Sequence, residues 1–106
     1  MELLFVCSRN KRRSLTAERI FNGRDGIHAN SAGTETGARV KLTPGMLSRA
    51  DIIFCMEKKH LRRIRENYSD IVADKRVVCL NIPDDFEYMD DELIDLLESV
   101  VGGYLE

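Results

Sequence analysis

Four short apolar runs are spaced along the chain, and each has the length of a β-strand rather than of a helix. The runs predict strands at positions 2–6, 27–30, 51–56 and 76–80. They are mostly apolar throughout instead of alternating between apolar and polar residues. Strands of that kind bury both faces, so the pattern predicts a parallel sheet that is covered on both sides.

Amphipathic segments lie between the apolar runs. Apolar residues recur at helical spacing in 14–22, in 57–68 and from 90 to 101, and these segments predict helices. A helical turn is expected at 46–49, and the polar segment 35–45 is expected to be a loop. Strands and helices alternate, so we predict a three-layer α/β fold in which four parallel strands are flanked by helices, as one domain over 1–106.

Composition narrows the classes of function. The 106 residues are 43% hydrophobic and 32% charged, which is typical of a globular protein. The formal net charge of −2 gives no bulk attraction to nucleic acid or membrane, and no apolar run has the length of a membrane span. Three cysteines without a signal-peptide pattern favour reduced thiols in the cytoplasm. His28 and His60 are too scattered to suggest a metal site, and no cofactor is expected.

The stretch from Cys7 to Ser14 carries the candidate chemistry. Cys7 follows the first predicted strand, and a basic loop leads from it into the first predicted helix. Such a turn gathers backbone N–H groups around a concavity that favours anions. Arg13 adds a planar fork of donors that suits phosphate oxygens. The stretch therefore predicts a nucleophilic thiolate beside an anion-binding loop. The loop residues between the cysteine and the arginine are Ser8, Arg9, Asn10, Lys11 and Arg12.

The spacing of Cys7, five residues, Arg13 and Ser14 resembles the phosphate loop of cysteine-dependent phosphatases. Asn10 and the apolar strand before Cys7 make the loop similar to that of the low-molecular-weight protein tyrosine phosphatase family. Further segments resemble this family in the same order along the chain, at 31–34, 50–61 and 82–86. The resemblance implies a parallel sheet with strand order 2-1-3-4 and hydrolysis of phosphate monoesters without a metal.

The resemblance also implies roles for the loop residues. Cys7 would attack phosphorus and form a phosphocysteine, while Arg13 would bind the equatorial phosphate oxygens and stabilise the transition state. Ser14 would hydrogen-bond the sulfur. Asn10 would hold the loop in shape in the left-handed conformation that asparagine tolerates, and Ser31 would tie down the Asn10 side chain. Lys11 and Arg12 are expected to face solvent or substrate.

The general acid of the family lies in a loop where an aspartate is followed, two residues later, by an aromatic residue. Phe86 follows Asp84 at that spacing, so Asp84 is expected to protonate the leaving oxygen. Asp85 then occupies the position where the family usually has proline. The expected substrate is a phosphorylated protein or a small aryl phosphate, and the expected product is inorganic phosphate.

The sequence departs from the family pattern at three places, two in the phosphate loop and one in the expected substrate loop. Arg9 stands where the family often has glycine, which predicts an altered or strained loop. Arg12 replaces a second loop cysteine, so a disulfide within the loop is impossible. Segment 35–45 lacks the aromatic residue with which the family packs against phosphotyrosine.

Two other functions stay open on the sequence. Arsenate reductases use the same loop and relay a disulfide through two further cysteines, for which Cys55 and Cys79 are the candidates. Both are centred in predicted strands, where core residues are the simpler interpretation. The second alternative is a non-catalytic module that binds phosphate or nucleic acid through its arginines.

Overall fold

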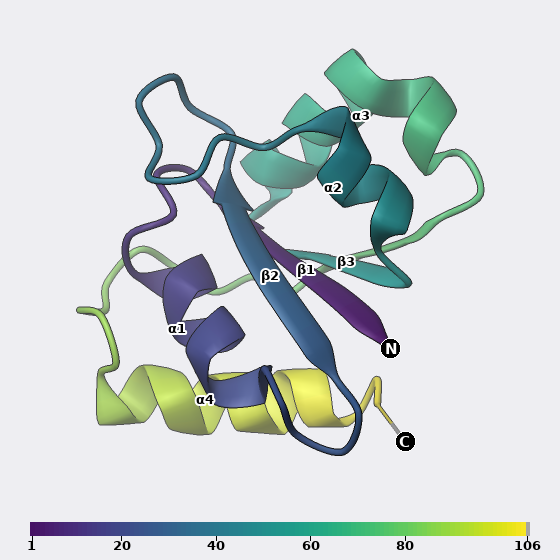
Figure 1. The fold of residues 1–106 in the computed structure, drawn as a ribbon. Helices are drawn as coiled ribbons and strands as arrows, with labels where there is room; N and C mark the ends of the chain where they lie inside the picture. The colour runs from purple at the N-terminus through teal and green to yellow at the C-terminus, as the bar shows by residue number, and fades with distance from the viewer. Residues whose placement is uncertain (106) are drawn as a thin grey trace.

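The computed structural model describes residues 1–105, in which strands and helices alternate along the chain. Figure 1 shows the arrangement of these elements around a central sheet. The elements in chain order are β1 (Glu2–Cys7), α1 (Arg13–Phe21), β2 (His28–Gly33), α2 (Pro44–Arg49), β3 (Ile52–Cys55), α3 (Lys58–Val72), β4 (Arg76–Cys79) and α4 (Asp91–Gly102).

The four strands form one sheet in the order β2-β1-β3-β4, and all neighbouring pairs are parallel. β1 pairs along its whole length with β2, from Glu2 opposite His28 to Cys7 opposite Gly33. The predicted fold class and strand order are therefore confirmed. Since parallel strands end at the same edge, the segments that follow β1, β2 and β3 meet at one edge of the sheet.

Each face of the sheet has its own hydrophobic core, because successive residues of β1 point to opposite sides. Leu3, Phe5 and Cys7 belong to the core that α1 and α4 cover. Leu4 and Val6 belong to the core under α2 and α3. In Figure 1, α1 and α4 accordingly lie on one side of the sheet and α2 and α3 on the other. These three layers explain why the strands are apolar throughout.

Several boundaries differ from those predicted. β2 continues three residues beyond the expected end, because the small residues of 31–33 still pair with β1. α2 begins at Pro44 instead of Met46, since Thr43 caps it by accepting a hydrogen bond from the Met46 N–H at 3.2 Å. α3 runs on to Val72 across a kink at Tyr68, where φ is −137° and ψ is 31°.

Candidate active site

The loop between β1 and α1 places Cys7 and Ser14 in direct contact. Cys7 Sγ lies 2.8 Å from Ser14 Oγ and accepts a hydrogen bond from the Asn10 N–H at 3.2 Å. Asn10 Nδ2 donates to Ser14 Oγ at 2.7 Å. Because Ser14 Oγ accepts from the amide, its single hydrogen is free to point at the sulfur. Two hydrogen-bond donors therefore converge on Cys7 Sγ.

Asn10 has the left-handed backbone that the sequence predicted, with φ of 60°. The predicted bond from Ser31 to its side chain is wrong, because Ser31 Oγ donates to Glu18 Oε1 at 2.6 Å. Ser31 pairs opposite Phe5 within β2, so it shares the face of the sheet that α1 covers. Ser31 reaches the loop only indirectly, since Glu18 lies 4.0 Å from Arg39, whose Nε donates to the Asn10 carbonyl at 3.2 Å.

Arg13 opens α1 and is almost fully buried, with 2% of its surface exposed. Its Nη1 donates to Glu57 Oε2 and to the Ile82 carbonyl, both at 2.7 Å. Its Nε lies 3.7 Å from Asp84 Oδ1. Burial alone would raise the pKa of the Glu57 carboxyl, but the hydrogen bond and charge of Arg13 hold that pKa below its ordinary value. The guanidinium is thus fixed at the base of the site by a charged partner.

Arg9 does not carry the backbone strain expected from replacing a glycine. Among residues 1–105, the non-glycine residues with a positive φ are Asn10, Asp25, Asn81 and Met89. The glycine that the loop requires is instead Gly33 at the end of β2. A Cβ there would lie 2.5 Å from the Ser8 carbonyl oxygen and 2.6 Å from the Ala38 side chain. Close packing of the loop on β2 therefore depends on the missing side chain of Gly33.

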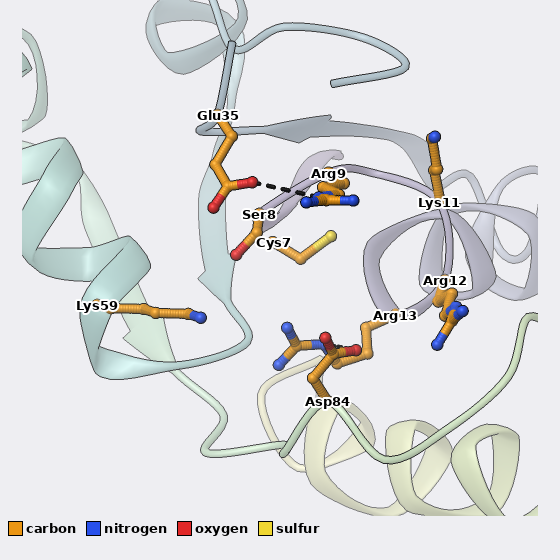
Figure 2. Close-up of a pocket in the computed structure, with 9 residues that line it drawn as sticks. All are labelled: Cys7, Ser8, Arg9, Lys11, Arg12, Arg13, Glu35, Lys59 and Asp84. Carbon is orange, nitrogen blue, oxygen red and sulfur yellow. Dashed lines mark hydrogen bonds and ion pairs between the residues drawn. The ribbon is translucent and has the colours of Figure 1, made fainter. Parts of the chain in front are cut away.

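A cavity of about 450 Å³ opens above Cys7 at this edge of the sheet, and Figure 2 shows its lining. The side chains of Arg13 and Asp84 lie side by side across the cavity from Glu35. Asp85 is exposed and does not line the cavity. The lining residues are Cys7, Ser8, Arg9, Lys11, Arg12, Arg13, Glu35, Lys59 and Asp84.

Three neighbours of the site come from the start of α3, and their roles were not predicted from the sequence. Glu57 binds Arg13, Lys59 lines the cavity, and His60 is buried beneath it with 1% exposed. His60 Nδ1 accepts from the Glu57 N–H at 3.0 Å, so its Nε2 carries the hydrogen and donates to Ser8 Oγ at 2.9 Å. The available signal was the position of Glu57, just after a buried strand that ends at the same edge as Cys7.

Burial and the charge of Arg13 lower the pKa of His60 to about 4. The imidazole is therefore neutral at pH 7 and acts as a fixed donor to the loop. Lys59 lowers this pKa further, while the carboxylates of Glu57 and Glu35 oppose the shift. A neutral histidine suits this place, because a second buried cation beside Arg13 would be repelled.

No protein-family model matches the sequence, and no curated protein matches it either. Solved structures do match over nearly the whole chain. A YwlE mutant from Bacillus subtilis has a TM-score of 0.76 at 21% identity, covering 100% of this chain and 99% of its own. The tyrosine phosphatase Wzb from Escherichia coli K30, in complex with phosphate, has a TM-score of 0.76 at 20% identity and covers 97% of this chain and 94% of its own.

A third match is a low-molecular-weight protein tyrosine phosphatase from T. tengcongensis, with a TM-score of 0.76 at 22% identity, covering 97% of this chain and 99% of its own. The chain has the fold of the low-molecular-weight protein tyrosine phosphatases. The fold that the phosphate-loop resemblance implied is thereby confirmed.

The two remaining cysteines lie apart from the cavity. Cys55 and Cys79 are opposite each other at the ends of β3 and β4, and all three cysteines are free thiols. Burial, together with the neighbouring Cys79, raises the pKa of Cys55 to about 12. Cys79 is only half-buried, so its interpretation as a core residue is wrong; β4 is an edge strand.

Residues 1–105 contain neither a metal-binding cluster nor a membrane-spanning helix. Nowhere in this range do three or more His, Cys, Asp or Glu side chains come together as a metal site would require. None of its helices combines the length and the apolar character needed to cross a bilayer.

Proposed function

We propose that this protein is a metal-independent, cysteine-dependent phosphomonoesterase. The observation that carries the proposal is the convergence of Cys7, Ser14, Arg13 and Asp84 on one cavity. They supply a thiolate, a stabilising hydroxyl, a cation for phosphate oxygens and a carboxyl at the cavity edge. Phosphoryl transfer to a protein nucleophile requires these parts and little more.

The reaction would proceed in two displacements. The Cys7 thiolate attacks phosphorus, the S–P bond forms as the P–O bond to the leaving group breaks, and Asp84 gives its proton to the departing oxygen. Water then attacks the phosphocysteine, Asp84 takes a proton from that water, and inorganic phosphate leaves with the thiolate restored. Arg13 and the loop N–H groups stabilise the equatorial oxygens in both steps. Such a thiol works reduced, so a reducing compartment such as the cytoplasm suits it.

Several solved structures with this fold are described as phosphatases, which supports a phosphoprotein or an aryl phosphate as substrate. A Streptococcus pyogenes relative of the fold is described as a low-molecular-weight protein tyrosine phosphatase, and a Geobacillus stearothermophilus one as an arginine phosphatase. A YwlE variant with serine in place of the cysteine holds a phosphorylated serine, which supports a covalent intermediate.

The test is hydrolysis of 4-nitrophenyl phosphate by purified protein in the presence of EDTA. Turnover is expected for the wild type and complete loss for Cys7→Ser, while Cys79→Ser serves as the matched control and keeps its activity. Iodoacetate should alkylate Cys7 faster than Cys55, whose raised pKa leaves it as the thiol, and inorganic phosphate should slow the Cys7 reaction. Absence of turnover together with labelling that phosphate does not affect would refute the proposal.

The two alternative functions gain no support from the site. A reductase relay needs a cysteine close to the nucleophile, yet Cys55 belongs to the core under α2 and α3 and Cys7 to the core on the opposite face. A purely binding module would not require a hydroxyl aimed at a buried sulfur. The site therefore supports the phosphatase better than either alternative.

A further inference from the structure

The lining of the cavity is mostly cationic and contains no aromatic residue. Five of the nine lining residues are arginine or lysine, two are carboxylates, and none is Phe, Tyr or Trp. Phe86, the aromatic residue that follows the acid loop, packs against the core shared with α4 instead of entering the cavity. A phosphotyrosine ring would thus find no aromatic surface on which to stack.

Arg13 is committed to the phosphoryl group, whereas the other four cations lie around the rim. Arg9, Lys11 and Arg12 come from the loop, and Lys59 comes from the first turn of α3. Figure 2 shows the Lys59 amine extended from the opposite side of the cavity toward Cys7. Cations from two separate elements therefore surround the space where a leaving group must lie.

These rim cations are only weakly engaged by the protein. Arg9 lies 3.4 Å from Glu35, Arg12 lies 3.9 Å from Glu87, and Lys59 lies 3.8 Å from Glu57. More than half of each basic side chain is exposed, at 74%, 52% and 60% respectively. Exposed pairs of this kind contribute little, so an anionic ligand can replace them readily. Lys11 has no carboxylate within 4.0 Å among residues 1–105.

The positive charge is concentrated around the cavity, whereas the whole chain carries a net charge of −2.

We propose that the substrates are small phosphomonoesters whose leaving group carries a second anionic group, a carboxylate or another phosphate. This inference rests on the proposed function. The cavity of about 450 Å³ has the size of a small-molecule site. Phosphoarginine is disfavoured as a substrate, because its guanidinium leaving group would add a cation to a rim that is already cationic.

A matched pair of esters tests the proposal. The substrates 3-carboxyphenyl phosphate and 3-carbamoylphenyl phosphate have the same shape, but only the first carries a second charge, and their kcat/KM values are compared. We expect the carboxylate ester to be preferred by on the order of 10-fold at low salt, and the preference to shrink as KCl screens the rim. Lys59→Gln should lower the ratio, and Lys59→Glu should bring it to one or below. Lys58→Gln removes the same charge from a neighbouring residue outside the cavity and should keep the wild-type ratio.

Each outcome separates this inference from the proposed function. Cys7-dependent turnover of 4-nitrophenyl phosphate with equal rates for the two esters overturns the anionic substrate class and leaves the phosphatase standing. A preference that survives undiminished in Lys59→Glu would overturn the part of the inference that places the second anion beside Lys59. If no ester is hydrolysed, the proposed function fails and the substrate class fails with it. A tyrosine phosphopeptide flanked by acidic residues that is hydrolysed 10-fold more efficiently than the carboxylate ester would overturn the assignment to small molecules.

Discussion

Glu57 holds Arg13 in place through a carboxylate oxygen 2.7 Å from Nη1, although 44 positions separate the two residues in the sequence. The contact links the residue just before α3 to the first residue of α1. The Ile82 carbonyl accepts from the same nitrogen. These two acceptors set the plane of the guanidinium before any substrate arrives, which is the preorganisation that phosphoryl transfer needs.

We therefore expect Glu57→Ala to hydrolyse 4-nitrophenyl phosphate with a kcat/KM lowered by on the order of 10- to 100-fold, because Arg13 loses its fixed orientation. Glu57→Gln should retain most of the activity, since its amide oxygen still accepts from Nη1 and removal of the negative charge favours an anionic ligand. Steady-state kinetics of the two variants, with thermal unfolding to confirm folding, make the comparison. Equal losses in both variants would show that the charge matters more than the orientation.

Asp84 and Asp85 give a second test, because only Asp84 lines the cavity. Asp84→Asn should cut kcat by roughly 10²-fold or more on phenyl phosphate, in line with loss of a general acid. The loss should be smaller on 4-nitrophenyl phosphate, whose leaving group needs less protonation. Asp85→Asn is the matched control and should stay near wild type. If Asp85→Asn is the impaired variant, the acid is assigned to the wrong residue of this loop.

The parts of the fold and site that could be predicted depend on residues that are close together in the sequence. Apolar runs predict the buried strands, and the spacing from Cys7 to Arg13 predicts the loop. Glu57 and His60 could not be found in this way, because they act on Arg13 and Ser8 across 44 and 52 positions. A charged residue at the start of a helix is usually exposed to solvent, so its presence in the sequence does not indicate a buried partner. Only the packing of α3 beside the loop gives these side chains their partners.

The predicted bond from Ser31 to Asn10 was wrong for a different reason, which concerns where the second strand ends. The residues of 31–33 are small, and serine and glycine are typical of turns, so the second strand was expected to end at position 30. Pairing with β1 overrides this local preference and carries β2 to Gly33. The extension sets the face of the sheet to which Ser31 points, and with it the bond to Glu18 instead of Asn10.

Gly33→Ala should weaken phosphate binding, because the new Cβ would lie 2.5 Å from the Ser8 carbonyl and push the loop away from β2. We expect the inhibition constant of inorganic phosphate to rise by on the order of 10-fold, as a displaced loop misaligns its N–H groups. Gly45→Ala is the control, since the nearest atom to its Cβ would be the flexible end of Arg49 at 3.2 Å. A Gly33→Ala protein with the inhibition constant of the wild type would contradict the close packing of the loop on β2.

His60 should make the protein less stable in mild acid. Its pKa is about 4 in the folded state, against an ordinary value of 6.5, because burial and Arg13 disfavour the imidazolium. Between these two values the unfolded chain binds the proton and the folded chain does not, so stability rises with pH across that window and is lost as pH falls from 6.5 to 4. The loss due to this one group is on the order of 3 kcal/mol.

Urea unfolding at a series of pH values measures this loss of stability. His60→Gln isolates it from the carboxylates that titrate nearby, since glutamine can still accept from the Glu57 N–H. The stability difference between wild type and His60→Gln should shift in favour of the variant as pH falls, and a difference that stays constant from pH 6.5 to about 4.5 would show that the buried imidazole is not held neutral.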